Sequence, residues 1–432
     1  MGKLIQTEQL YTDFHTFEGV VKALNGVSVV VNQGETYGLV GESGCGKSVT
    51  VRSMMRIVQA PGKIVGGKIL LFFREEQRTT GIDILKRSEA YMTSIRGDDI
   101  SMIFQEASTS LNPVLTVGYQ VGESFNFHRR AQMLEETIRA LDAELSKSLF
   151  PPIRWWKTLQ RALLGRERAT LRRYEAQIDA VDSQLCTLED REDSKSVRTR
   201  MLLNRRRDRL GEFDTLCQIA KRVPVLRRYY RKVDKTIRSH VVELLRSLGV
   251  ASPERCFDCH PHELSGGMQQ RVVIAIALAC HPLLLIADEP TSNLDVTIQA
   301  QIVDLIKNLK EQTISSVLFI THDLGLVAEI CDRATVMYAG DVCETAEVRE
   351  IFRNPLHPYT RGLLRSVPRV EKIEQLNTIP GTVPNLIAPP SGCRFHPRCP
   401  EVMEICPLEK PPVVEVAPGH SVACYLYGDG KQ

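Results

Sequence analysis

One stretch, Glu263 to Asp295, constrains the fold of this chain more than any other, and it reads ELSGGMQQRVVIAIALACHPLLLIADEPTSNLD. A Ser-Gly-Gly turn leads into a predicted helix over Met268–Ala279, and the first turn of a helix offers unpaired backbone N–H groups to an anion such as phosphate. The apolar run Leu283–Ala287 predicts a buried strand that ends on Asp288 and Glu289. One carboxylate can hold Mg²⁺ and the other can orient a water, so the stretch predicts a nucleotide site.

Such a site needs a loop for the phosphates, and GESGCGKS, Gly41 to Ser48, matches the pattern G-x-x-x-x-G-K-S. An apolar strand is predicted before it, over Thr36–Val40, and a helix after it. The glycines let the backbone approach a phosphate without a Cβ in the way. Lys47 brings a positive charge to the β- and γ-phosphates, and Ser48 offers its hydroxyl to Mg²⁺. The residues predicted to contact ATP in this segment are Gly41, Glu42, Ser43, Gly44, Cys45, Gly46, Lys47, Ser48 and Val49.

The loop together with LSGG at Leu264–Gly267 resembles the ATP-binding-cassette (ABC) family, whose signature is LSGG. A phosphate loop alone would indicate only an NTPase. The resemblance implies an α/β fold, a P-loop NTPase of the RecA-like type, with a β lobe, an α-helical subdomain and a bound ATP with Mg²⁺. It also implies that two chains enclose two ATP molecules head to tail.

The resemblance assigns roles to further residues. Gln105 ends the predicted strand Ser101–Gln105 and resembles the glutamine that touches Mg²⁺ or the attacking water. Glu289 would polarise that water, and His322, after the apolar strand Ser316–Ile320, resembles the histidine that contacts the γ-phosphate. The catalytic residues implied in this way are Glu289, His322 and Gln105, and the Mg²⁺ ligands are Ser48, Gln105 and Asp288.

Other ATP contacts are expected from the signature and from the β lobe. Ser265, Gly266 and Gly267 would bind the γ-phosphate held by the opposite subunit. Asp295 ends the sequence SNLD, which resembles the D-loop although Asn293 replaces the more common Ala.

The β lobe is predicted from alternating valines in Leu24–Val31, a pattern typical of a half-buried strand. In ABC proteins an aromatic residue of this lobe stacks on adenine. The spacing offers Phe14 first and Phe17 second.

A basic insertion, residues 129–238, separates Gln105 from the signature and enlarges the helical subdomain. It holds 27 Lys or Arg against 16 Asp or Glu, although the net charge of the whole chain is only +3. Apolar residues at spacings of 3 and 4, interrupted by the polar Asp190–Ser196, predict an antiparallel helical hairpin between Pro152 and Pro224. The predicted seam is Leu171, Tyr174, Ile178, Val181, Leu185 and Leu188, followed by Leu210, Phe213, Cys217 and Ala220.

The role of this insertion stays open between a solvated or protein-binding face, a membrane surface and nucleic acid. Chromosome-maintenance and repair ATPases also insert a coiled coil before the signature, which makes a DNA-maintenance ABC ATPase the alternative from another class. Those proteins lack the C-terminal text of this chain, so no nucleic acid is expected.

That text, NPLHPYTRGLLRSVP at Asn354–Pro368 and the tail after it, resembles the ATPases of oligopeptide, dipeptide and nickel importers. It implies an ATP-hydrolysing subunit that powers the uptake of peptides, with nickel or another small solute as the alternative. The implied partners are two transmembrane permease subunits, a second identical or homologous ATPase and, indirectly, an extracytoplasmic substrate-binding protein. Because no signal peptide or membrane-spanning segment is evident, the chain is expected at the cytoplasmic face of the membrane.

The C-terminal extension, residues 351–432, follows the ABC ATPase domain, residues 1–350, and carries four cysteines. Their spacing, C-x₅-C-x₆-C-x₁₇-C, is looser than that of a zinc ribbon and names no metal by itself. Four thiolates suit Zn²⁺ or a [4Fe–4S] cluster, and the resemblance to peptide importers favours the cluster. The expected ligands are Cys393, Cys399, Cys406 and Cys424.

Overall fold

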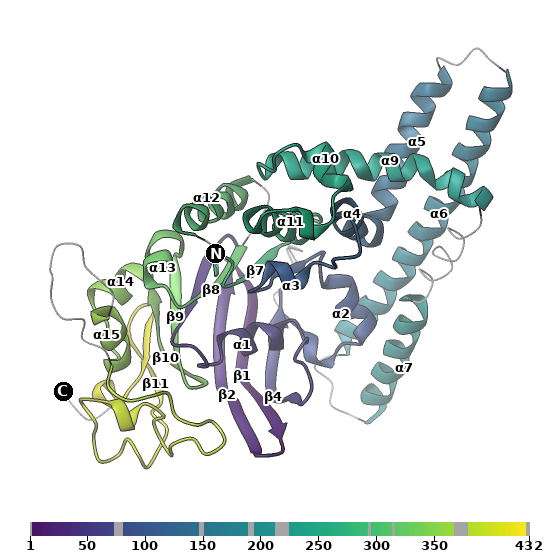
Figure 1. The fold of residues 1–432 in the computed structure, drawn as a ribbon. Coiled ribbons are helices and arrows are strands. Elements are labelled where there is room, and N and C mark those ends of the chain that lie inside the picture. The colour runs from purple at the N-terminus through teal and green to yellow at the C-terminus, as the bar shows by residue number, and fades with distance from the viewer. Residues whose placement is uncertain are drawn as a thin grey trace. The chain divides into compact units, whose positions relative to one another are not determined.

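The structure, a computed structural model shown in Figure 1, describes residues 2–72, 81–146, 151–188, 194–211, 224–292, 295–312, 316–366 and 379–428. The chain forms two compact units. The first unit combines residues 1–85, 102–105 and 283–432, and the second combines residues 86–101 and 106–282.

An antiparallel sheet of the first unit, with strand order β2-β1-β4-β5, forms the β lobe. Val27, Val29 and Val31 are buried on one face of its strand β2, which confirms the strand predicted from the alternating valines. The strands of this sheet are β1 (Lys3–Thr16), β2 (Gly19–Asn32), β4 (Gly62–Leu71) and β5 (Ile82–Asp83).

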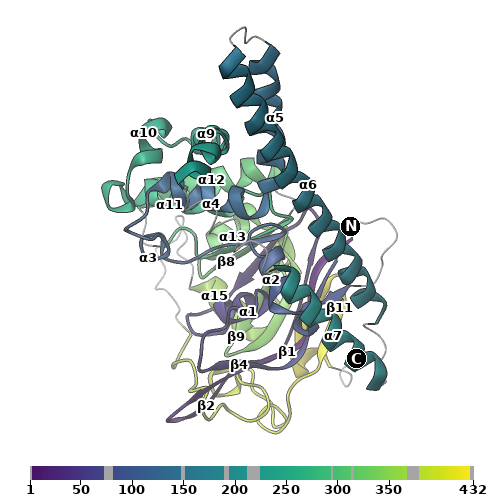
Figure 2. The same cartoon turned by 90° about the vertical axis from the view of Figure 1, so that its right-hand side faces the viewer.

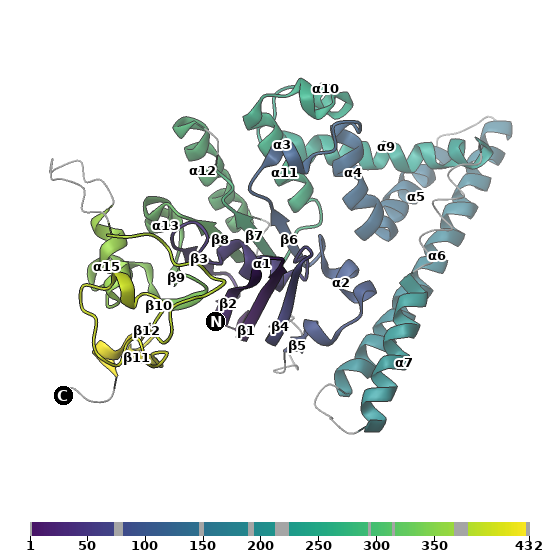
Figure 3. The same cartoon turned by 60° about the horizontal axis from the view of Figure 1, so that its bottom comes forward.

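A second, larger sheet has the strand order β11-β12-β10-β9-β3-β8-β7-β6. Its strands β9, β3, β8 and β7 are parallel neighbours, as Figure 3 shows, and β3 is buried along its whole length. The structure confirms the predicted strand Thr36–Val40 with its bounds, and it confirms the predicted strands at β7 and β8 within one residue. These strands are β3 (Thr36–Val40), β6 (Ile100–Ile103), β7 (Leu284–Asp288), β8 (Ser316–Thr321), β9 (Arg333–Tyr338), β10 (Asp341–Glu347), β11 (Val413–Ala417) and β12 (His420–Ala423).

The C-terminal segment joins this sheet, because β12 pairs antiparallel with β10 and β11 pairs with β12. Glu344 of β10 is fully buried, and its carboxylate accepts hydrogen bonds of 2.9 Å from the backbone N–H groups of Leu356 and His357. The imidazole of His420 lies 2.8 Å from the same carboxylate. One buried carboxylate therefore ties three parts of the C-terminal half together.

Helices flank the first unit's strands: Lys47–Met54 (α1) contacts β1 and β2 of the β lobe, whereas Leu324–Ile330 (α13) contacts β3 and β8 of the larger sheet. They are α1 (Lys47–Met54), α12 (Val296–Gln312), α13 (Leu324–Ile330), α14 (Val348–Arg353) and α15 (Pro358–Arg365).

The second unit is helical in its described parts. Its helix α11 buries Val272, Ile274 and Ala275 and confirms the helix predicted over Met268–Ala279, although it begins two residues earlier. The helices are α2 (Glu89–Ile95), α3 (Ala107–Ser110), α4 (Val117–His128), α5 (Arg130–Ser146), α6 (Pro151–Thr187), α7 (Ser194–Gly211), α9 (Pro224–Ser247), α10 (Pro253–Asp258) and α11 (Gly266–Leu278).

The long helix α6 packs on two neighbours in succession, first α5 and then α7, which is visible in Figure 2. Leu164 is buried beside α5, and Val181 and Leu185 are buried further along the helix. Sequence spacing predicted the apolar seam of α6 but not the packing of α6 on α5. Ion pairs as well as apolar contacts join α5 and α6, and ion pairs leave no apolar periodicity in the sequence. The predicted seam residues Phe213, Cys217 and Ala220 lie outside the described residues, as does the side chain of Leu210.

Several basic side chains of the insertion are paired with carboxylates of the same unit, which lowers the positive charge available to an outside anion. These pairs are Arg130–Glu167, Lys157–Glu144, Arg161–Asp142, Arg168–Glu135, Arg207–Asp182 and Lys232–Glu144. Across the described ranges, the structure has no helix with both the length and the apolar character needed to cross a membrane.

Candidate functional site

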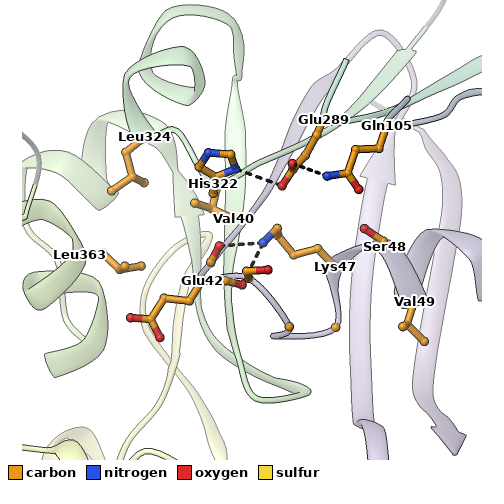
Figure 4. Close-up of a pocket in the computed structure, with 14 residues that line it drawn as sticks. Val40, Glu42, Lys47, Ser48, Val49, Gln105, Glu289, His322, Leu324 and Leu363 are labelled. Carbon is orange, nitrogen blue, oxygen red and sulfur yellow. Dashed lines mark hydrogen bonds and ion pairs between the residues drawn. The ribbon is translucent and has the colours of Figure 1, made fainter. Parts of the chain in front are cut away.

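A pocket in the first unit gathers residues from the carboxyl ends of neighbouring parallel strands, where α/β sheets bind their ligands. Figure 4 shows that the phosphate loop, Gln105, Glu289 and His322 face one another across it. The lining residues are Val40, Gly41, Glu42, Ser43, Gly44, Gly46, Lys47, Ser48, Val49, Gln105, Glu289, His322, Leu324 and Leu363.

The loop between β3 and α1 requires glycine at two positions. Gly41 and Gly46 have φ angles of +152° and +100°, values that other residues rarely adopt. A Cβ on Gly41 would lie 2.2 Å from the backbone oxygen of Met337, so a side chain there would clash with the main chain. Cys45, predicted as a contact, does not line the pocket, because its side chain is buried beneath the loop.

The amine of Lys47 lies against the first half of the same loop. Its Nζ donates hydrogen bonds to the backbone oxygen of Gly41 at 2.7 Å and to that of Glu42 at 3.0 Å. The side chain is buried, with 5% of its surface exposed. These bonds keep the cation in the loop that is predicted to bind phosphate.

Ser48 and Asp288 meet beside the pocket. The hydroxyl of Ser48 donates a 2.9 Å hydrogen bond to Oδ1 of Asp288, which is fully buried. The other oxygen, Oδ2, has no hydrogen-bond partner in the described part of the chain. Burial raises the pKa of Asp288, while the hydrogen bond from Ser48 opposes that shift. A buried, unpartnered carboxylate oxygen next to a hydroxyl fits a hard cation such as Mg²⁺, which prefers oxygen ligands.

Glu289 follows Asp288 with a left-handed φ of +46°, an uncommon conformation for a residue with a side chain. The amide of Gln105 donates to its Oε2 at 3.0 Å, and Nδ1 of His322 lies 3.1 Å from its Oε1. The backbone N–H of Glu289 donates a 3.0 Å hydrogen bond to the backbone oxygen of Ile320. This bond holds Glu289 beside the end of the neighbouring strand β8. Glu289 is therefore in direct contact with both of the other residues predicted to be catalytic, Gln105 and His322.

Family comparisons identify this arrangement. The family model described as "ABC transporter" matches residues 24–292, more than half of the chain. The chain belongs to the ABC transporter family, whose ATP-binding proteins are ATPases. A second model, "Oligopeptide/dipeptide transporter, C-terminal region", matches residues 343–406 of this ABC ATPase.

Relatives of this ABC ATPase match over nearly its whole length. The probable peptide ABC transporter ATP-binding protein of Sinorhizobium fredii is 37% identical, covering 98% of this chain and 94% of the relative. The oligopeptide transport ATP-binding protein AppD of Bacillus subtilis is 37% identical, and the match covers 99% of this chain and 98% of AppD. The dipeptide transport ATP-binding protein DppD of the same organism is 36% identical, and the match covers 99% of this chain and 95% of DppD. Among solved structures, a dimeric bacterial ABC transporter cassette has a TM-score of 0.48 at 21% identity, covering 80% of this chain and 99% of the other.

The remaining predicted contacts of the ABC ATPase lie outside the pocket. Ser265 precedes α11, and Gly266 and Gly267 open it, in the second unit. Oδ1 of Asp295 accepts a 2.9 Å hydrogen bond from the backbone N–H of Ile298, so this carboxylate caps the start of α12. Asn293 lies outside the described residues.

Neither aromatic candidate for adenine lines the pocket. Phe14 of β1 is partly buried, and its ring lies 2.7 Å from the position that a Cβ on Gly62 would take. Phe17, in the turn after β1, is 99% exposed. The structure thus leaves the ring of Phe17 free and packs that of Phe14.

Sequence motifs missed the contribution of the C-terminal segment to the pocket. Leu363 of α15 lines it, and Tyr359 and Arg398 contact Glu42 of the phosphate loop. Tyr359 stands in the HPYT text that indicated the importer family, but no spacing in that text indicated a contact with a loop more than 300 residues earlier.

The metal centre predicted in the tail is not supported by the arrangement of ligands. Within the described ranges, no group of three or more His, Cys, Asp or Glu is placed so that it could hold a metal ion. The cysteines nevertheless share surroundings, since all four line one small cavity in the C-terminal segment. They are Cys393, Cys399, Cys406 and Cys424.

Proposed function

We propose that this ABC ATPase is the subunit of an importer that hydrolyses ATP to power the uptake of peptides through a membrane permease. The observation that carries the proposal is the match of 98–99% of the chain to relatives named as peptide, oligopeptide and dipeptide transport ATP-binding proteins. The C-terminal model for oligopeptide and dipeptide transporters supports the same substrate class.

In this function the phosphate loop binds the ATP phosphates and Ser48 and Asp288 hold Mg²⁺, with Gln105 as a further ligand. The hydrogen bond between Ser48 and Asp288 supports this assignment, as does the unpartnered oxygen of Asp288. Bound Mg²⁺ neutralises charge that develops on the phosphates during transfer. Lys47, whose amine lies against the loop carbonyls, brings its charge to the β- and γ-phosphates.

Glu289 polarises the attacking water, and Gln105 and His322 orient its carboxylate. Their contacts of 3.0 and 3.1 Å with the two carboxylate oxygens support this division of roles. A general base must be held within hydrogen-bonding reach of the water it activates, and two fixed partners restrict the rotation of the carboxylate. The side chain of His322 is 67% exposed, against 16% for Glu289, so it remains accessible to the γ-phosphate.

A second ATPase subunit, identical or homologous, completes the site. Ser265, Gly266 and Gly267 of one chain bind the γ-phosphate held by the other, and Asp295 lies at the same interface. The start of α11 supports this role, because its first backbone N–H groups have no partners within the helix.

Adenine stacks on an aromatic residue of the β lobe, and the exposure of Phe17 favours this residue over the packed Phe14. A free aromatic face can take a stacked base, whereas a ring already packed against Gly62 has lost part of that surface. The remaining partners are two transmembrane permease subunits and, indirectly, an extracytoplasmic substrate-binding protein. In this role the ATPase would lie at the cytoplasmic face of the membrane.

For the tail, we propose a [4Fe–4S] cluster with Zn²⁺ as the alternative, held by the four cysteines. Their shared cavity supports a common ligand, although their placement does not form a metal-binding group. The cluster would be structural, because none of the four cysteines lines the nucleotide pocket.

The proposal is tested by purifying the tagged full-length chain from its native membranes in mild detergent. The expected result is co-purification of two permease subunits, Mg²⁺-dependent ATP hydrolysis and, by mass spectrometry, a bound peptide. Nickel in place of peptide would select the alternative solute within the same family. Absence of permease together with salt-sensitive binding to duplex DNA would overturn the proposal in favour of the DNA-maintenance class.

A further inference from the structure

The C-terminal segment forms hydrogen bonds with Glu42, the second residue of the phosphate loop. Arg398, at the end of the short 3₁₀ helix His396–Arg398, donates from Nη1 to Oε2 of Glu42 at 2.8 Å and from Nη2 to Oε1 at 3.2 Å. This is a bidentate ion pair between residues that are 356 positions apart in the chain. Such pairs fix direction as well as distance, because the planar guanidinium matches the carboxylate.

Tyr359 of α15 holds the backbone of the same residue. Its hydroxyl oxygen accepts a 3.0 Å hydrogen bond from the N–H of Glu42. The ring is fully buried and packs edge-on against Tyr338 and at a tilt against Phe395. The acceptor is therefore carried on a side chain that has little freedom to move.

Arg398 is itself held in place before it reaches the loop. Its Nε donates to the backbone oxygen of Pro380 at 2.9 Å, and its guanidinium lies 5.6 Å from the centre of the Tyr338 ring. Only 7% of its side chain is exposed. Because the arginine is already ordered, its bond to Glu42 restrains the loop and not the arginine.

Glu42 passes this restraint to the phosphate-binding lysine. Lys47 donates to the backbone oxygens of Gly41 and Glu42, so its amine lies on the residue that Arg398 and Tyr359 hold. A loop rich in glycine loses more conformational entropy on ordering than other segments, and contacts that order it in advance strengthen ligand binding.

We propose that Arg398 and Tyr359 are positioning residues for the phosphate loop, through which the C-terminal segment sets the ATP affinity of the site. The proposal rests on the ATP-binding function proposed above. It gives the C-terminal segment a role in nucleotide binding that is separate from any metal the four cysteines hold.

The test is titration of the full-length protein with a fluorescent ATP analogue. Arg398→Gln is expected to weaken binding about tenfold, equivalent to ~1.4 kcal/mol, with little change in the turnover number at saturating ATP. Arg398→Lys keeps the positive charge but cannot form the bidentate pair, so its ATP affinity should fall between those of the wild type and Arg398→Gln. Tyr359→Phe keeps the buried ring and removes only the acceptor of the Glu42 N–H, so it should weaken binding while the protein stays folded.

The matched control is Lys410→Gln. Lys410 also joins the C-terminal segment to the core, through a 2.6 Å ion pair with Asp341, but it does not touch the loop. It should leave ATP affinity unchanged.

A double-mutant cycle with Glu42→Gln completes the experiment. If the contact is direct, Glu42→Gln combined with Arg398→Gln should be no worse than either change alone. Additive losses, or an Arg398→Gln affinity equal to that of Lys410→Gln, would overturn the inference. Failure of the wild-type protein to bind the analogue would instead reject the proposed function.

Discussion

The hydroxyl of Ser48, at the start of α1, donates a 2.9 Å hydrogen bond to the carboxylate of Asp288, at the end of β7. The two residues are 240 positions apart in the chain. Parallel strands bring the ends of β3 and β7 to one edge of the sheet, with β8 between them. Under the proposed function, these two side chains would hold Mg²⁺, which would neutralise charge on the phosphates.

The first prediction follows from that contact. Asp288→Asn keeps the size of the side chain but replaces the carboxylate with a neutral amide. The unpartnered oxygen then becomes either an amide oxygen, which is a weaker Mg²⁺ ligand, or an NH₂ group, which is not a ligand. We expect ATP hydrolysis to fall at least about 10²-fold and to need a higher Mg²⁺ concentration. A Mg²⁺ titration of the ATPase rate measures both effects, and an unchanged Mg²⁺ requirement would contradict the assignment.

The second prediction concerns Glu289. Glu289→Gln should leave ATP binding intact and slow turnover by roughly 10²-fold or more, because a base that positions and polarises water contributes about that much. The variant should accumulate as a closed ATP-bound dimer, detectable by size-exclusion chromatography. Glu329→Gln, which removes a surface ion pair with Lys307, is the control and should hydrolyse ATP normally. Near-normal turnover of Glu289→Gln in the assembled complex would refute its role.

The third prediction tests the packing of α6 on α7. Arg207 is 4% exposed and pairs with Asp182 at 3.2 Å, and burial raises the pKa of Asp182. Arg207→Gln would leave a carboxylate buried without its cation, so we expect a loss of ~3 kcal/mol in the free energy of unfolding. Arg161→Gln breaks the more exposed pair with Asp142, which water screens, and should cost far less stability than Arg207→Gln.

Denaturant unfolding compares these two variants. Adding Asp182→Asn to Arg207→Gln should recover much of the loss, because the unpaired charge is then removed. Equal stability of the two single variants would show that α7 does not depend on this pair. ATP binding should survive in both, since neither residue lines the nucleotide pocket.

The fourth prediction is a pH dependence at Asp99. Burial, reinforced by the charge of Asp98 and opposed by Arg129, raises the pKa of Asp99 from 3.8 to about 6. The folded protein therefore binds this proton more tightly than the unfolded chain, and the resulting stabilisation is lost as the pH rises through about 6. Asp99→Asn should be more stable than the wild type by ~1–2 kcal/mol near pH 8 and not near pH 4. Thermal unfolding at both pH values measures the difference, and a pH-independent difference would exclude titration of Asp99.

The fifth prediction concerns the four-cysteine cavity. Protein purified without oxygen should be brown, absorb broadly near ~400 nm and contain about four irons per chain. Cys406→Ser should remove the colour, whereas Cys331→Ser, at a buried cysteine outside that cavity, should not. Colourless protein with one zinc would establish the alternative metal. A folded protein that contains neither metal would rule the site out.

The sequence by itself determined the elements whose chemistry is local. A phosphate loop after an apolar strand and a strand ending in Asp288 and Glu289 could be read directly, because side-chain burial and backbone conformation there follow from neighbouring residues. The strand of alternating valines was predicted for the same reason, as was the helix after the signature. The catalytic roles of Glu289, Gln105 and His322 were expected only from the family resemblance, and their mutual contacts were not predicted.

Tertiary structure decided the contacts between distant segments. No local pattern indicated that Arg398 and Tyr359 hold Glu42, because an ion pair depends on where two surfaces meet and leaves no periodicity in either. The same reason explains why α6 was expected to pack only within one hairpin, whereas ion pairs and buried leucines also place it against α5. Phe14 and Phe17 were ranked by spacing, yet the ring of Phe14 packs beside Gly62, the first residue of β4, whereas Phe17 is 99% exposed. Periodicity records which face of an element is buried, and only the folded chain determines which element covers it.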